Sequence, residues 1–130
     1  MMRECYVAID FDGTCVTNHY PHIGDDIGAD PYLQAACALG AKLILLTMRD
    51  GDKLEEAVGW FQTHNVPIWM VNRNPESGWS DSPKVYAHIY VDDSGLMAPM
   101  IPADNRKREH MDWDRAGPWL LRRIAGILNQ

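Results

Sequence analysis

The chain has 130 residues, 46% of them hydrophobic and 23% charged, and a formal net charge of −6 at pH 7. This length and apolar content predict a single domain over residues 1–130 with one core. The acidic charge argues against broad binding to nucleic acids or anionic membranes, because both need a basic surface. No apolar run reaches the roughly 18 residues of a membrane-spanning helix. There is no signal-peptide pattern, and the three cysteines lack disulfide or zinc spacing, so we expect a cytoplasmic protein.

Four short apolar runs predict the strands of a sheet. They span residues 5–9, 42–46, 68–71 and 88–91. Apolar runs without polar alternation are typical of strands that are buried on both faces of a parallel sheet.

Helical patterns alternate with these runs. The first helix is predicted to begin with Asp30 as its cap and to end at Gly40. The second is predicted to begin with Asp50 as its cap, and the third to span residues 114–128. Strand–helix alternation predicts an α/β fold. We expect a Rossmann-like three-layer sandwich, with a central, mostly parallel sheet and helices on both faces.

Three of the predicted strands end in polar residues that can carry chemistry: Asp10, Thr47 and the pair Asp92–Asp93. Ligands of such sheets bind beyond the carboxyl ends of the strands, so we expect these side chains to converge. Asp10 and Asp12 lie in the segment Asp-Phe-Asp-Gly-Thr. Two carboxylates at this spacing can act as a nucleophile and a proton donor. The alternative interpretation of the segment is an acidic turn without a chemical role.

Asp92 and Asp93 are adjacent carboxylates that repel each other unless a cation lies between them. Mg²⁺ prefers such oxygen ligands, so the pair predicts a metal site. The alternative interpretation is an acidic turn that is exposed to solvent and binds no ion. Thr47 offers a hydroxyl beside a helix N-terminus, which favours an anion. Lys84 and Arg49 are further candidate contacts for a phosphate, or else ordinary surface residues.

These segments, in this order, resemble the haloacid dehalogenase superfamily of phosphotransferases. The chain is similar to a group of small capless hydrolases of bacterial and phage type. The resemblance covers most of the chain from Tyr6 to about Asp93, and extends to the pair Asp112–Trp113. It rests on segments 9–14, 20–24, 43–60 and 91–94.

The resemblance implies an Mg²⁺-dependent phosphomonoester hydrolase. By position, Asp10 would be the nucleophile that forms an aspartyl-phosphate, and Asp12 the general acid and base. Mg²⁺ would be held by Asp10, the backbone carbonyl of Asp12, Asp92 and Asp93. Thr47 and Lys84 would contact the phosphoryl oxygens. The family's Asp-Asp-Arg is Asp-Asp-Ser here, with Ser94 in the last position, so no arginine acts there.

The intervals between the motifs leave no room for the cap domain of larger superfamily members. An uncapped site is open and suits a bulky phosphorylated substrate, or a second subunit that completes it. Several aromatic side chains are equally well interpreted as substrate contacts or as surface residues: His19, Tyr20, His22 and Trp79.

Three other functions use some of the same residue types. A phosphoacceptor signalling domain also uses an acidic pair, a Thr and a Lys, but in a different order along the chain. A catalytically silent phosphate-binding domain would not need every motif residue. A phosphatase for nucleotides or polynucleotide ends is favoured by the basic residues 106–108, but the net charge opposes it, and a solvated loop explains them as well.

Overall fold

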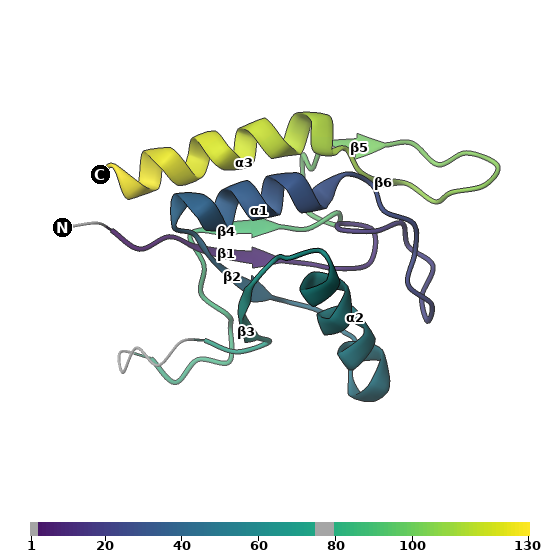
Figure 1. Ribbon diagram of the computed structural model, residues 1–130, viewed down its shortest axis with the longest axis horizontal. Helices are drawn as coiled ribbons and strands as arrows, with labels where there is room; N and C mark the ends of the chain where they lie inside the picture. The colour runs from purple at the N-terminus through teal and green to yellow at the C-terminus, as the bar shows by residue number, and fades with distance from the viewer. Residues whose placement is uncertain (1–2, 75–79) are drawn as a thin grey trace.

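The computed structural model describes residues 3–74 and 80–130 of the chain (Figure 1). The elements follow in the order β1 (Tyr6–Ile9), α1 (Ala29–Leu39), β2 (Lys42–Leu45), α2 (Gly51–Thr63), β3 (Ile68–Val71), β4 (Ile89–Val91), β5 (Met100–Ile101), β6 (His110–Met111) and α3 (Trp113–Leu128). The four apolar runs therefore form β1 to β4, each within one residue of its predicted bounds.

The four longer strands form one parallel sheet in the order β3-β2-β1-β4. Ala8 of β1 is in register with Ile44 of β2 on one side and with Tyr90 of β4 on the other. The arrows of β1, β2 and β4 point the same way in Figure 1. The predicted α/β class with a mostly parallel sheet is confirmed. β5 and β6 form a separate antiparallel pair.

The hydrophobic core lies on one face of this sheet. Val7, Ile9, Leu43 and Leu45 alternate onto that face, are fully buried, and join one cluster with buried side chains from all three helices: Leu33, Phe61 and Ile124. From β1 to β2 to β3, the chain moves across the sheet in the same direction at each step. Because both connections are right-handed crossovers, the two connecting helices, α1 and α2, lie on the same face.

The opposite face carries Ala8, Ile44 and Tyr90. The Tyr90 hydroxyl donates to the carbonyl of Val85 and accepts from the N–H of Ala87, and both of these residues are buried. Residues 80–88, which form neither a helix nor a strand, therefore contact this face of the sheet in the part of the chain that the structure describes. Ser80, Ser82 and Pro83 in this connection disfavour a helix.

The start of α1 differs from the prediction by two residues. α1 begins after Gly28, which adopts a left-handed conformation with φ of 85°. The prediction that Asp30 caps this helix is wrong: Asp30 lies in the first turn, where its charge suits the helix dipole. Gly40 ends α1, with φ of 111°, and Asp50 is the N-cap of α2, both as predicted. Among the described residues, no helix is long and apolar enough to cross a membrane.

Candidate functional site

Three carboxylates meet at the carboxyl edge of the sheet. Ile9 and Val91 are paired in register, so Asp10 and Asp92 leave neighbouring strands side by side. Asp10, Asp92 and Asp93 each offer a carboxylate oxygen, and these oxygens lie within 4.8 Å of one another. The convergence expected from the strand ends is therefore present for these three residues.

Gly13 allows the loop after Asp10 to approach Asp93 closely. Its φ is +83°, and a Cβ atom at this position would lie 2.4 Å from Oδ2 of Asp93. Only glycine accommodates both the conformation and the approach. The C-terminal part of the chain holds this loop in place. The N–H of Met111 donates to the carbonyl of Gly13 at 2.9 Å, and the indole N–H of Trp113 donates to the carbonyl of Thr14 at 2.6 Å.

Thr14 connects two of the carboxylates. Its hydroxyl donates to Oδ2 of Asp10 at 2.9 Å, lies 3.1 Å from Oδ1 of Asp93, and accepts the backbone N–H of Asp93 at 3.0 Å. The side chain is fully buried. Our sequence analysis quoted Thr14 as part of a motif but assigned it no role. The sequence did contain a signal for this role, because Thr14 is a polar residue that directly follows the turn glycine Gly13 shortly after a strand.

The electrostatics of this cluster are unusual for carboxylates. Burial raises the pKa of Asp10 to about 8, and a hydrogen bond shared with Asp93 and the negative charges of Asp92 and Asp93 act in the same direction. The hydroxyl of Thr14 opposes these effects. Within residues 3–74 and 80–130, no Lys or Arg forms an ion pair with any of the three. Uncompensated negative charge and an all-oxygen donor set fit a hard divalent cation such as Mg²⁺.

The side chain of Asp12 lies outside this cluster and pairs with Arg49. The Nε and Nη2 atoms of Arg49 each donate to one carboxylate oxygen of Asp12 at 2.7 Å. The Arg49 side chain is 1% exposed and that of Asp12 is 17% exposed. The hydrogen bonds that Arg49 donates to Asp12 raise the pKa of Arg49, so the guanidinium is firmly charged. Arg49 was a candidate substrate contact, but its guanidinium is turned into the protein.

Thr47 stands at the end of β2, next to β1. Its hydroxyl accepts the N–H of Arg49 at 3.1 Å. Its own backbone forms a reciprocal pair with the amide of Asn72: the N–H of Thr47 donates to Oδ1 at 2.8 Å, and Nδ2 donates to the Thr47 carbonyl at 2.9 Å. Asn72 has a left-handed backbone, with φ of 52°. Sequence analysis did not identify Asn72, although an asparagine directly after a strand is typical of this conformation.

Lys84 is not joined to the carboxylate cluster. It is exposed, and its ammonium lies 5.8 Å from the centre of the Tyr90 ring. Tyr90 lies two residues before Asp92, so Lys84 is positioned over the sheet face beside β4. A contact between Lys84 and a phosphoryl group stays a prediction.

The segment between β1 and α1 forms a flap that projects from the end of the molecule toward which the strands point (Figure 1). The flap is defined here as residues 17–25, and its base is closed by the N–H of Thr17 donating to the Asp25 carbonyl at 2.9 Å. The Tyr20 side chain is 56% exposed, with its ring centre 5.1 Å from the guanidinium carbon of Arg49. The rings of His19 and His22 are 5.6 Å apart. Trp79, the fourth candidate aromatic contact, lies outside the described residues.

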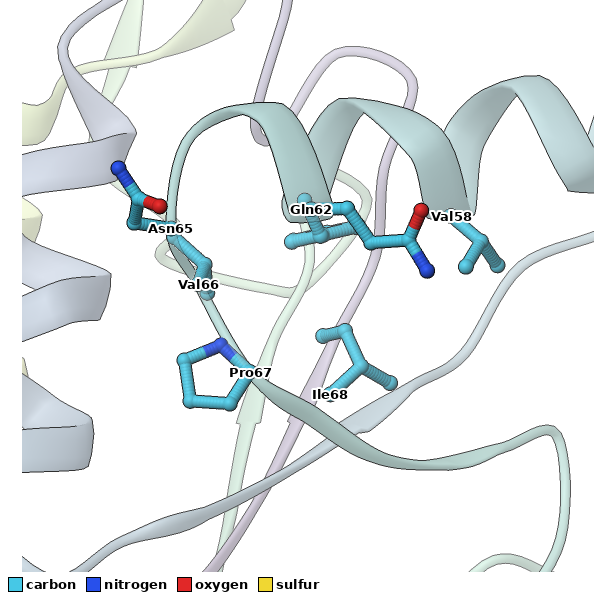
Figure 2. Close-up of a pocket in the computed structure, with 7 residues that line it drawn as sticks. Val58, Gln62, Asn65, Val66, Pro67 and Ile68 are labelled. Atoms are coloured by element: carbon cyan, nitrogen blue, oxygen red, sulfur yellow. The ribbon is translucent and has the colours of Figure 1, made fainter.

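A surface cavity of about 510 Å³ lies away from these residues (Figure 2). It is formed where α2 ends and β3 begins, so it belongs to the opposite edge of the sheet. Its lining has no titratable side chain: Val58, Phe61, Gln62, Asn65, Val66, Pro67 and Ile68. Figure 2 shows the amides of Gln62 and Asn65 as the only side-chain polar groups among the labelled residues. The cavity therefore does not contribute to the carboxylate site.

Comparisons with known proteins find a similar solved structure. No protein-family model matches the chain, and no curated protein matches it either. A solved structure of a conserved protein from Bacteroides thetaiotaomicron is similar, with 32% sequence identity and a TM-score of 0.67. The match covers 72% of this chain and 79% of the other. At this identity and coverage, the chain belongs to the same family as that conserved bacterial protein.

Proposed function

We propose that this protein is a cytoplasmic, Mg²⁺-dependent phosphomonoester hydrolase that works through a phosphorylated Asp10. The observation that supports this most directly is the cluster of Asp10, Asp92 and Asp93 at the carboxyl edge of the sheet. The resemblance to the haloacid dehalogenase superfamily adds the order of the chemical steps.

Asp10 is suited to be the nucleophile because Thr14 fixes one of its carboxylate oxygens, Oδ2. In the first step, an oxygen of Asp10 attacks phosphorus and the bond from phosphorus to the ester oxygen breaks. Asp12 gives a proton to that leaving oxygen. In the second step, a water molecule attacks phosphorus, Asp12 takes up its proton, and phosphate leaves with regeneration of Asp10.

Both carboxylate oxygens of Asp12 accept hydrogen bonds from the guanidinium of Arg49, which fixes the direction in which this carboxyl group faces. Thr47 presents a hydroxyl on the neighbouring strand end, and Lys84 adds an exposed positive charge near β4. Their role in this proposal is to bind the phosphoryl oxygens and to orient the phosphorus.

Mg²⁺ would be held by Asp10, Asp92 and Asp93, with the backbone carbonyl of Asp12 as a further ligand. When bound, the ion neutralises the charge that otherwise keeps a carboxylate away from a phosphate dianion. Binding would also favour the ionised form of Asp10, which is the nucleophilic form.

The experiment is hydrolysis of p-nitrophenyl phosphate with Mg²⁺, together with trapping of a phosphorylated protein. Asp10→Asn and a chelator should both abolish turnover, and Asp52→Asn, an exposed acidic residue on α2, should retain it. Turnover that survives in Asp10→Asn would contradict the proposal. A folded wild-type protein that binds Mg²⁺ but yields neither p-nitrophenol nor a phosphorylated Asp10 would also contradict it, and would favour a silent phosphate-binding domain.

A second candidate function is hydrolysis at phosphorylated nucleotides or polynucleotide ends. The loop between β5 and β6 carries Arg106, Lys107 and Arg108, and Nζ of Lys107 lies 3.8 Å from Oδ2 of Asp25 at the flap base. The loop and the flap project from the end of the molecule toward which β1, β2 and β4 point (Figure 1). Basic side chains thus lie at the rim of an acidic site, where they suit a substrate with additional phosphates.

A comparison of substrates tests this second candidate. A nucleoside bisphosphate or a phosphorylated oligonucleotide should have a higher kcat/KM than p-nitrophenyl phosphate, and this advantage should shrink as salt is added. Equal values with no salt dependence would reject it.

A further inference from the structure

The guanidinium of Arg49 uses every N–H that it has inside the protein. Nε and one N–H of Nη2 donate to the two oxygens of Asp12, each at 2.7 Å. The remaining three donate to backbone carbonyls: His22 at 2.8 Å, Lys53 at 3.3 Å and Pro21 at 3.4 Å. A guanidinium has five N–H donors, and all five have an acceptor here.

Aromatic rings close the two remaining sides of this guanidinium. Its carbon lies 5.2 Å from the ring centre of Phe11 and 5.1 Å from that of Tyr20. Phe11 belongs to the core, whereas Tyr20 belongs to the flap. The side chain is therefore sealed between the interior and the flap, which explains its 1% exposure.

A buried cation needs an anion close by, and Asp12 supplies it. The carboxylate of Glu56 also lies near Arg49, at 4.0 Å, but its side chain is 47% exposed. The two short bonds to Asp12 thus keep Arg49 in place. In turn, Arg49 holds the flap through the carbonyls of residues 21 and 22 and through the Tyr20 ring.

We propose that Arg49 is a positioning residue that joins Asp12 and the flap into one unit. When the flap opens, the acceptors at residues 21 and 22 are lost and Arg49 loosens its hold on Asp12. When the flap is closed, the two hydrogen bonds from Arg49 hold the Asp12 carboxylate in a fixed orientation. The consequence for turnover rests on the proposed function, but the coupling between the flap and Asp12 does not.

Hydrogen exchange of the flap amides tests the coupling without any turnover. Asp12→Asn and Arg49→Lys should each raise exchange across residues 17–25 by about tenfold or more, with little change in the amides of β1 and β2. Arg122→Lys, an exposed position on α3, is the matched control and should leave the flap unchanged. Flap exchange that is the same in both variants and in the wild type would overturn the proposal.

Kinetics and chemical rescue separate positioning from direct substrate binding. If Arg49 bound the substrate, Arg49→Lys would raise KM and largely keep kcat. As a positioning residue, it should lower kcat at nearly constant KM. In Arg49→Ala, millimolar guanidinium should restore both flap protection and kcat. Restored kcat without restored flap protection would contradict the coupling.

The outcomes remain distinguishable if the proposed function fails. A wild-type protein without turnover whose flap loosens in Asp12→Asn would reject the hydrolase but keep the coupling. Normal turnover of the wild type, together with a flap that is unchanged in Asp12→Asn, would keep the hydrolase and reject the coupling. If Arg49→Ala does not fold, Asp12→Asn and Arg49→Lys carry the test.

Discussion

The hydroxyl of Thr14 accepts the backbone N–H of Asp93 at 3.0 Å, although the two residues are 79 positions apart in the chain. The same hydroxyl donates to Asp10. One fully buried side chain thus ties the end of β1 to the end of β4, where the three carboxylates meet. The spacing of the cluster depends on this contact as well as on the pairing of the strands.

Replacement of Thr14 by valine should therefore destabilise the protein and misplace Asp10. Valine keeps the shape but leaves the N–H of Asp93 without its acceptor, which costs about 1–2 kcal/mol in the free energy of unfolding. Urea denaturation measures this loss, and turnover should fall as well. Thr63→Val, at an exposed position on α2, is the control and should change stability by less than about 0.5 kcal/mol. Equal stability of the two variants would count against the role of Thr14.

Gly13→Ala should be strongly destabilising. The new Cβ would lie 2.4 Å from Oδ2 of Asp93, and the backbone has a positive φ that side chains disfavour. We expect a loss of about 2 kcal/mol or more, with disruption of the carboxylate cluster. Gly59→Ala is the matched control because nothing lies within 4 Å of its Cβ position, in a helix. It should stabilise the protein by up to about 1 kcal/mol. A Gly13→Ala variant that binds Mg²⁺ like the wild type would contradict the close approach.

Asp10→Asn should abolish turnover and yet raise the melting temperature when no divalent ion is present. The pKa of Asp10 is raised from 3.8 to about 8 in the folded protein, so the folded state holds this proton more tightly than the unfolded chain. Between these two values, stability of the wild type falls as pH rises. The asparagine variant lacks this part of the pH dependence. Its melting temperature should therefore exceed that of the wild type at pH 8 and equal it at pH 4.

Mg²⁺ should reverse this difference. The ion compensates the charge of the ionised cluster, so it should raise the melting temperature of the wild type at pH 8 and have a much smaller effect on Asp10→Asn. Thermal melts with Mg²⁺ and with a chelator provide the measurement. A wild type that gains no stability from Mg²⁺ at any pH would refute a metal site at these residues.

The double variant Arg106→Ala, Arg108→Ala should lower kcat/KM for substrates that carry a second phosphate and leave p-nitrophenyl phosphate unaffected. Both side chains are exposed on the loop next to the flap, so the loss should be greatest at low salt. Arg122→Ala combined with Arg123→Ala removes the same charge from α3 and serves as the control. If kcat/KM for these substrates falls as much in the control variant, the effect comes from the net charge of the protein and not from the loop.

The strands and most helix ends were predictable because local patterns determine them. Continuous apolar runs marked β1 to β4, and Gly40 and Asp50 marked the helix boundaries, since backbone conformation there depends on near neighbours. The first helix shows the limit of such patterns. Asp30 has the side chain of a good cap, but the left-handed conformation of Gly28 sets the start of α1 two residues earlier than predicted.

The sequence by itself determined the class of fold and which carboxylates meet, since strand ends of a parallel sheet share one edge. Only the tertiary structure decided that Arg49 faces inward onto Asp12, 37 positions away, and that Thr14 reaches Asp93. It also decided that the irregular segment 80–88 contacts the second face of the sheet and that Lys84 lies over Tyr90. The physical reason is distance along the chain. Periodicity reports which face of an element is apolar, whereas the partner of a buried polar group depends on how remote segments pack.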